Sequence, residues 1–144
     1  MGLVQQSMAG DARALARVPA NDQIVPAATT ATSFATGDGS KWFGLIARYV
    51  DAKNFYYVTV RQDNTISLRK QVNGTIYVLD TAPLTVTAGT AYTLRLEAIG
   101  TALRAHVNGN VVLEATDSSH ARGRYGLATY QTAAAYDDFV AWGP

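Results

Sequence analysis

The segment from Trp42 to Leu79 constrains the fold most, because its apolar and polar side chains alternate with a period of two. In an extended chain Val58 and Val60 would point to one side, and the residues that flank them would point to the other. A β-strand imposes this period when one face meets a core and the other meets water. The segment therefore predicts four short strands joined by three tight turns.

Turn residues divide the rest of the chain at similar intervals. Asp38-Gly39, Asn73-Gly74 and Asn108-Gly109 tolerate the positive φ angles that hairpin turns require. We find no convincing helical period, and about twelve short strands with this spacing predict an all-β sandwich or barrel. The expected strands are 3–7, 12–17, 23–34, 42–50, 55–62, 65–71, 75–80, 91–99, 102–108, 110–115, 123–130 and 135–142.

The inward positions of these strands supply the expected core of two packed sheets. We expect residues 1–144 to form one domain, since this length is enough to bury a core of ordinary size. The core residues predicted by the alternation are Leu45, Tyr49, Val58, Val60, Ile66, Leu68, Leu94, Leu96, Leu103, Val107 and Leu127.

Composition narrows the class of protein. A hydrophobic fraction of 48% and a charged fraction of 16% are typical of a folded domain. A net charge of +1 gives no strong field toward nucleic acid or a membrane, so we expect neither as a partner. The absence of Cys excludes disulfides, thiolate metal sites and a Cys nucleophile. No apolar run is long enough to span a membrane as a helix.

The outward face of the 42–79 segment carries the candidate binding residues. Strand alternation places Arg48, Tyr57, Arg61 and Arg69 together on this face, on neighbouring strands about 5 Å apart. Arginine binds carboxylates and hydroxyl groups through a planar fork, and an aromatic ring can stack on a sugar. These residues therefore predict a site for a polar ligand. The alternative is a solvated β-face with ordinary cross-strand pairs.

Four phrases in a fixed order resemble a known superfamily. They are QQSMAGDARAL at 5–15, FGLIARYVDAKNFYYVTVR at 43–61, the segment 79–109 that follows the Asn73-Gly74 turn, and the segment 115–142. The most specific pieces are G-L-x-A-R-Y with N-x-Y-Y, and G-x-x-G-L-x-T-Y followed by two Asp residues. Together they resemble the concanavalin A-like lectins and glucanases, and more narrowly the modules attached to bacterial pectate lyases and other polysaccharide-active enzymes.

This resemblance implies a two-sheet antiparallel β-sandwich with jelly-roll topology, whose meander forms a concave sugar-holding sheet. It also implies a structural Ca²⁺ held with help from Asp137 and Asp138, since hard carboxylate oxygens suit this ion. The alternative for these two residues is a surface turn, or one buried Asp that accepts backbone N–H groups. One departure is that relatives carry a further N-terminal strand with a Trp before the segment 3–7.

The sequence offers little support for catalysis. Hydrolysis on this fold requires paired carboxylates, and Glu97 and Glu114 are each isolated from a second acid at alternating spacing. His106 and His120 are expected at the surface, and Asp117 with the following serines is expected to cap a turn rather than form a catalytic triad. Arg and Tyr residues leave a lyase mechanism open.

The reading favoured by these observations is a non-catalytic carbohydrate-binding module for a polysaccharide, with uronate-containing chains such as pectin as leading candidates. A protein-binding or adhesive sandwich domain is the first alternative, and a polysaccharide lyase or glycoside hydrolase is the second. The resemblance further implies a secreted bacterial protein in which the module is fused to a polysaccharide-degrading enzyme. Met1-Gly2 is not followed by a basic region and an apolar core, so we expect the signal peptide not to be part of this sequence.

Overall fold

The computed structural model describes residues 3–5, 11–15, 21–34, 42–61, 63–85, 91–130 and 132–137. Each of the twelve expected strands overlaps one observed strand, and the described residues contain no helix that could cross a membrane. The strands are β1 (Leu3–Gln5), β2 (Asp11–Leu15), β3 (Gln23–Phe34), β4 (Trp42–Asp51), β5 (Asn54–Arg61), β6 (Thr65–Val72), β7 (Thr75–Pro83), β8 (Ala91–Ile99), β9 (Ala102–Val107), β10 (Asn110–Thr116), β11 (Arg124–Tyr130) and β12 (Thr132–Asp137).

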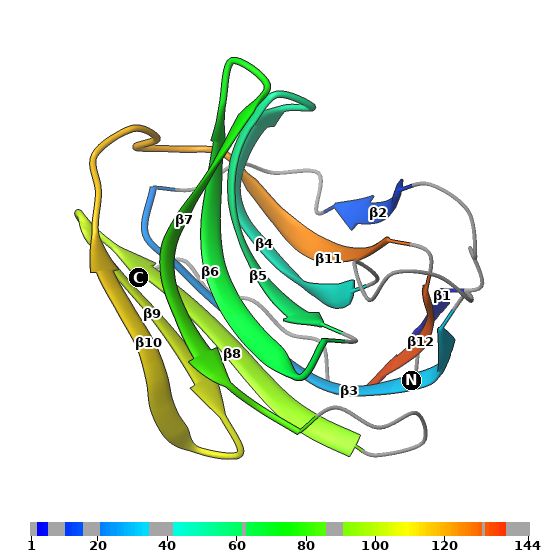
Figure 1. Ribbon diagram of the computed structural model, residues 1–144. Helices are drawn as coiled ribbons and strands as arrows, with labels where there is room; N and C mark the ends of the chain where they lie inside the picture. The colour runs from blue at the N-terminus through cyan, green and yellow to red at the C-terminus, as the bar shows by residue number, and fades with distance from the viewer. Residues whose placement is uncertain are drawn as a thin grey trace.

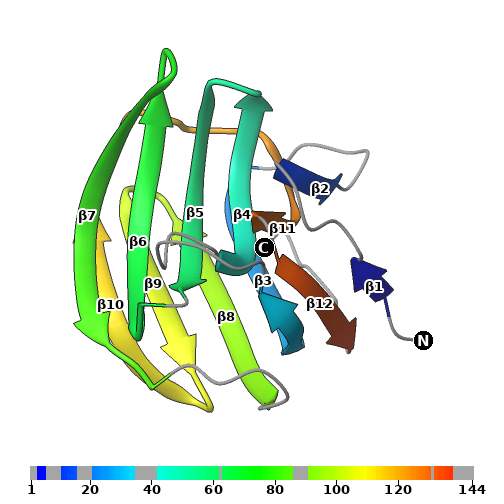
Figure 2. The same cartoon turned by 45° about the vertical axis from the view of Figure 1, so that its right-hand side comes forward.

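The strands form two six-stranded antiparallel sheets. Sheet A has the order β1-β12-β3-β8-β9-β10, and sheet B has the order β2-β11-β4-β5-β6-β7. The chain repeatedly crosses between the sheets, so β1, β12, β3 and β8 occupy the same positions in sheet A as β2, β11, β4 and β5 in sheet B. Figure 2 shows β4 to β7 side by side, with β8, β9 and β10 behind them. This arrangement confirms the expected jelly-roll sandwich.

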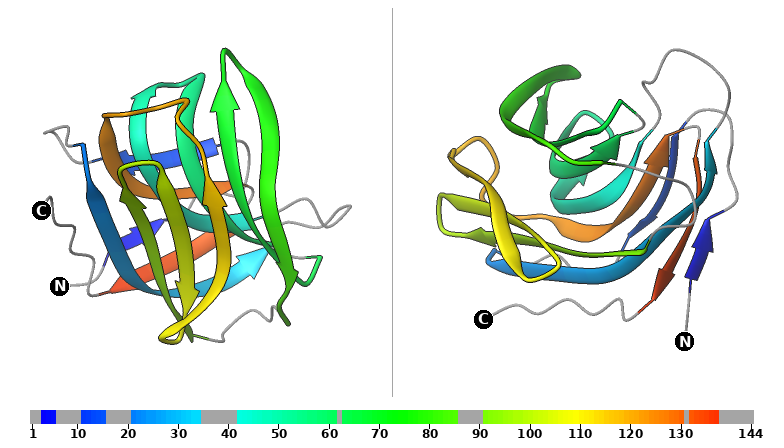
Figure 3. Two further views of the ribbon diagram at one scale, coloured as in Figure 1. Left: turned by 90° about the vertical axis from the view of Figure 1, so that its left-hand side faces the viewer. Right: turned by 60° about the horizontal axis from the view of Figure 1, so that its bottom comes forward.

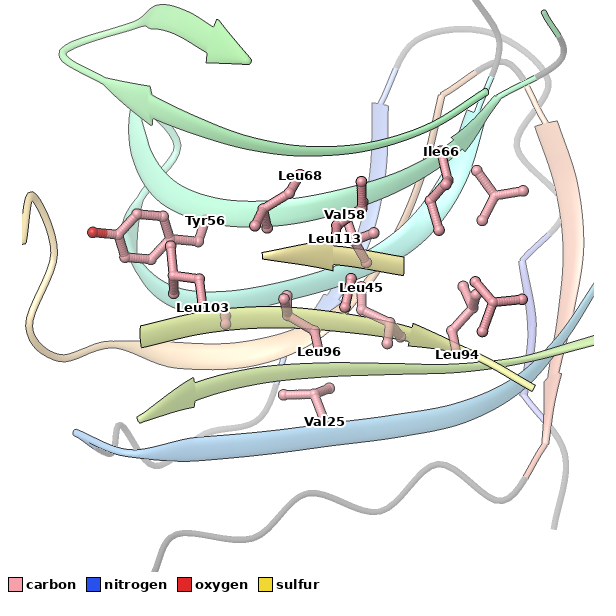
Figure 4. Packing of buried hydrophobic residues seen from close by; sticks show 14 of the residues in the cluster. Val25, Leu45, Tyr56, Val58, Ile66, Leu68, Leu94, Leu96, Leu103 and Leu113 are labelled. Carbon is pink, nitrogen blue, oxygen red and sulfur yellow. The ribbon is translucent and has the colours of Figure 1, made fainter. Parts of the chain in front are cut away.

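The core lies between the sheets and confirms most of the predicted positions. Inward side chains of β4, β5 and β6 meet those of β8, β9 and β10, and ten of the eleven predicted core residues belong to this cluster. In Figure 4 Tyr56 lies at one end of the cluster near Leu103, and Ile66 and Leu94 lie at the other. Burial of this continuous apolar layer supplies the main driving force for folding.

Hairpin turns fix the register of the meander. Asn73 and Gly74 adopt φ angles of 51° and 85°, and Asn108 and Gly109 adopt 52° and 87°. Two consecutive positive φ angles match the twist of the strands that the turn joins, and Asn and Gly adopt them at the lowest cost. Two of the three predicted Asx-Gly turns are thus confirmed, and Asp38-Gly39 lies outside the described residues.

Strand β4 departs from simple alternation after Ala47. Arg48 has a φ of 50°, and the register of β4 shifts relative to β5 between Ala47 and Asp51. An extra residue at such a bulge reverses the direction of every side chain that follows it. The prediction that Tyr49 belongs to the main core is therefore wrong, because Tyr49 packs on the outer side of sheet B with Ile46, Phe55 and Tyr57. The expected outward orientation of Arg48 is wrong for the same reason.

Candidate functional site

The outer face of sheet B holds three of the four candidate binding residues. Figure 3 (right) shows that the two sheets bow in the same sense, which makes this outer face concave and that of sheet A convex. Tyr57 of β5 lies directly opposite Arg69 of β6 in the antiparallel register. Arg61 lies on the same side of β5, four residues after Tyr57. We name Tyr57, Arg61 and Arg69 the arginine face.

Aromatic rings of β4 and β5 pack around Tyr57 on the outer face of sheet B. The ring centroids of Trp42 and Tyr57 are 5.5 Å apart, those of Phe55 and Tyr57 5.1 Å, and those of Tyr49 and Phe55 5.4 Å. Tyr57 is only 3% exposed, whereas Trp42 and Tyr49 are partly exposed. The ring of Tyr57 is thus held among its neighbours and offers little surface to a ligand.

Three of these aromatic residues were not among the predicted site residues. Phe55 could have been found, since it alternates in phase with Tyr57 and Arg61 along β5. Trp42 could also have been found, because it alternates in phase with Gly44 and Ile46 before the bulge. Tyr49 could not, because its outward position depends on the bulge that precedes it.

A hydrogen-bonded pair of hydroxyl groups, one on each strand, orients Arg69. Thr59 of β5 and Ser67 of β6 are paired across the strands, and their hydroxyl oxygens are hydrogen-bonded. Arg69 Nε donates to Ser67 Oγ at 2.7 Å. The terminal nitrogens of Arg69 make no hydrogen bond to another described residue, so its guanidinium fork is held at one point and open at its outer end.

Arg61 is more enclosed than Arg69. Its Nε lies 3.8 Å from Asp63 Oδ2, and its side chain is 12% exposed. The two arginines lie on either side of the Thr59–Ser67 pair, because each is two residues from one member of it. Two guanidinium groups spaced in this way present positive charge on both sides of a polar centre.

Arg48 occupies a different region, at one end of the sandwich. Its side chain is 2% exposed, and its guanidinium donates to the carbonyl oxygens of Asn21 and Gly100, both at 2.7 Å. It also donates at 3.2–3.3 Å to the carbonyls of Ala98 and His120 and to Asp22 Oδ1. We name these contacts the Arg48 network. They tie the start of β3, the β8–β9 turn and the loop 117–123 to the bulge in β4.

The loop between β10 and β11 is fixed by a second polar cluster. Asp117 accepts hydrogen bonds from Tyr56 Oη at 2.6 Å, from the backbone N–H of Ser119 at 2.8 Å, and from Lys70 Nζ. The Ser119 bond confirms the prediction that Asp117 caps a turn. Burial alone would raise the pKa of Asp117, but the bonds from Lys70, Tyr56 and Ser119 outweigh it and hold the pKa well below its usual range.

This cluster explains two further side chains. Burial and the hydrogen bond to Asp117 raise the pKa of Tyr56 to about 12, so its hydroxyl stays protonated at neutral pH. The backbone N–H of His120 donates to Tyr56 Oη at 3.1 Å, and the His120 ring lies against the Tyr56 ring. His120 is buried, so its predicted place at the surface is wrong. His106 is partly exposed and bonded to Glu97.

The expected calcium site stays a prediction. The described residues contain no cluster of three or more His, Cys, Asp or Glu side chains that could hold a metal ion. Asp137 is described only as the backbone position of β12 that pairs with Ala28 of β3, and Asp138 lies outside the described residues.

No family model and no curated protein sequence matches the chain. Solved structures do. The carbohydrate binding module CBM66 from Bacillus subtilis has a TM-score of 0.83 and 24% identity, over 96% of this chain and 84% of that one. A Bacillus licheniformis β-glucanase has a TM-score of 0.64 and 10% identity, over 99% and 78% of the two chains. A human galectin-16 variant has a TM-score of 0.63 and 8% identity, over 96% and 98%.

These three structures differ in activity, so what they share with this chain is the architecture. Their range from a binding module to a lectin and a glucanase matches the superfamily that the sequence phrases resemble. A likeness of fold is not a likeness of site, because one fold hosts many functions. The chain has the jelly-roll fold of the concanavalin A-like lectins and glucanases.

Proposed function

We propose that this protein is a non-catalytic carbohydrate-binding module that recognises a polysaccharide on the concave outer face of sheet B. The observation that carries the proposal is that Arg61 and Arg69 both lie on that face, on either side of the Thr59–Ser67 pair. The fold shared with a carbohydrate binding module and a galectin supports it.

The chemistry of the face favours an anionic chain. A guanidinium donates two parallel hydrogen bonds to a carboxylate, and Ser67 presets the orientation of the Arg69 fork. Trp42 provides a partly exposed ring on the same face, where a sugar ring can stack. We therefore propose uronate-containing polysaccharides such as pectin as the ligand class, bound through Arg61 and Arg69.

A binding role fits the acidic residues better than hydrolysis does. A glycosidase needs two carboxyl groups about 5 to 10 Å apart on either side of the scissile bond. Both Glu residues lie on sheet A, away from the arginine face, and among the acids that the structure describes Asp63 alone is paired with one of its arginines, 3.8 Å from Arg61 Nε. As the resemblance implies, we propose that the module serves an exported bacterial polysaccharide-degrading protein and brings it to its substrate.

Affinity electrophoresis in gels that contain soluble polygalacturonate tests this proposal. The wild-type protein should be retarded, and Arg61→Ala and Arg69→Ala should each weaken binding about tenfold or more, the effect of losing one charge-assisted bond to a carboxylate. Arg122→Ala is the matched control, since Arg122 is exposed and far from the face along the chain, with one 3.3 Å bond to Asn21.

Three results would overturn the proposal. The first is release of unsaturated or reducing sugar products from polygalacturonate, which would indicate an enzyme. The second is retardation that Arg61→Ala and Arg69→Ala leave unchanged, which would move the site elsewhere. The third is no retardation in gels that contain polygalacturonate or any neutral polysaccharide, which would favour the protein-binding alternative.

A further inference from the structure

The convex outer face of sheet A carries a different set of charges. Glu97 of β8, Arg104 of β9 and Glu114 of β10 lie in one row across three neighbouring strands. The next outward-facing row on the same three strands, toward the end of β8, consists of Ile99, Ala102 and Thr116. A row of charged groups thus lies beside a row of small and apolar side chains.

Two members of the charged row are available to a ligand. Glu97 is occupied, because Oε2 lies 3.0 Å from Arg95 Nη2 and Oε1 lies 3.0 Å from His106 Nε2. Arg104 and Glu114 are exposed, and neither side chain makes a hydrogen bond or ion pair with another residue in the described part of the chain. A free guanidinium and a free carboxylate therefore occupy neighbouring strands, about 5 Å apart.

These two side chains border a shallow depression with a volume of about 240 Å³. The side chains of Ala102 and Thr116 on its lining are small, so a ring could approach the sheet closely there. The residues that line it are Ala102, Leu103, Arg104, Glu114, Ala115 and Thr116. Its backbone is well held, since Asp80 Oδ2 of β7 accepts the Glu114 N–H at 3.0 Å at the edge of sheet A.

We propose that this depression is a second carbohydrate site, distinct from the arginine face, that takes a neutral sugar through neighbouring hydroxyl groups. The Glu114 carboxylate accepts hydrogen bonds from hydroxyls, and the Arg104 guanidinium donates to hydroxyl oxygens. Ala102 and Thr116, which line the depression, would lie under the apolar face of the ring. One positive and one negative group cancel, so this site gains nothing from an anionic sugar, unlike the arginine face.

Two sites on opposite faces have a consequence for avidity. The outer faces of sheets A and B point away from each other (Figure 1), so one molecule can hold two chains at once. A material that contains both acidic and neutral polysaccharides would then bind the module more tightly than either polysaccharide alone. The reason is that the second contact is made at high effective concentration.

Amide NMR spectra of the ¹⁵N-labelled protein test the second site directly. Neutral tetrasaccharides of glucose, xylose and galactose are added to about 50 mM, a concentration that detects millimolar affinity. At least one should shift the amides of 102–104 and 114–116. Arg104→Ala and Glu114→Gln should each weaken that response at least fivefold. Lys53→Ala, which removes an exposed charge from the β4–β5 turn, should leave it unchanged.

The outcomes separate this site from the one on sheet B. Shifts at 102–104 and 114–116 that survive both substitutions, shifts confined to sheet B, or no shifts with any tetrasaccharide would each overturn the second site. Titration with polygalacturonate in the same samples reports on the arginine face. If the wild-type protein shows no amide shifts with polygalacturonate but still responds to a neutral tetrasaccharide, the proposed function is overturned and the second site stands.

Discussion

Arg48 and Arg69 are twenty-one residues apart in a single meander, and they illustrate two uses of one side chain. Arg69 lies in the uninterrupted register of β5 and β6 and is held by one side-chain bond, and its outer nitrogens make no bond to another described residue. Arg48 lies at the bulge, is 2% exposed and donates to five oxygen atoms. The first arginine is one for which we propose a ligand, and the second donates to the protein's own carbonyl groups.

The difference shows how a single backbone torsion decides the role of a residue. Regular alternation would have put both side chains on the concave face. A φ of 50° at Arg48 turns its side chain into the end of the sandwich, where Gln23 Oε1 accepts its backbone N–H at 2.8 Å. Three segments that are distant in sequence meet there, and the guanidinium donates to carbonyl oxygens in each of them, with the bonds to Ala98 and His120 buried.

The largest expected effect is on stability at the Arg48 network. Arg48→Ala should lower the free energy of unfolding by about 3 to 5 kcal/mol, because it leaves buried carbonyls without donors. Arg48→Lys should recover part of this loss, since an ammonium group has three donors but no fork. Urea unfolding followed by tryptophan fluorescence measures both. A loss below about 1 kcal/mol would show that the Arg48 network contributes little to holding these segments together.

The next effect concerns the acid stability of the same end of the sandwich. The lowered pKa of Asp117 contributes stability that is fully present above the ordinary Asp value near 4 and is lost as the pH falls through the lowered folded-state pKa. Asp117→Asn should lower the free energy of unfolding by about 1 to 3 kcal/mol at neutral pH. It should also make that free energy fall less steeply as the pH decreases.

Asp63→Asn provides the comparison for this measurement on the arginine face. Asp63 is exposed and 3.8 Å from Arg61 Nε, so its replacement should cost about 1 kcal/mol or less. Urea midpoints measured from pH 2 to pH 7 distinguish the two variants. Equal slopes in acid would show that the Asp117 cluster carries no special share of the acid sensitivity.

The smallest expected effect on stability is at Arg69. Arg69→Ala should change the free energy of unfolding by about 1 kcal/mol or less, because its only bond to another described residue is the one to Ser67. The same variant should lose most of its affinity for polygalacturonate. A large loss of stability would make Arg69 a structural residue like Arg48 and remove the contrast between the two regions.

The sequence predicted the regular parts of this molecule well. Alternation identified β5 and β6 and their inward residues, because these two strands keep one register with each other over their full length. The same pattern placed Tyr57, Arg61 and Arg69 on one face. It could not predict that Tyr57 would be 3% exposed, since ring packing with Trp42 and Phe55 depends on the neighbouring strand and its register.

The errors share a physical origin in contacts between distant segments. Nothing in the residues around Arg48 marks a positive φ, which Arg rarely adopts, and the network that stabilises it involves segments at 21–23, 98–100 and 120. His120 is buried by Tyr56, sixty-four positions away, so no local pattern could reveal it. The row of Arg104 and Glu114 likewise exists only through the β9–β10 register.

Binding of an anionic polysaccharide to the concave face of sheet B is proposed to depend on Arg61 and Arg69. The most direct test is the affinity for polygalacturonate of the wild type and the Arg61→Ala/Arg69→Ala double variant as NaCl rises from about 50 to 500 mM, which shortens the screening length several-fold. We expect a steep loss of wild-type affinity as the salt concentration rises, and a weak affinity that hardly changes with salt in the double variant. Equal affinities and equal slopes for the two proteins would contradict it.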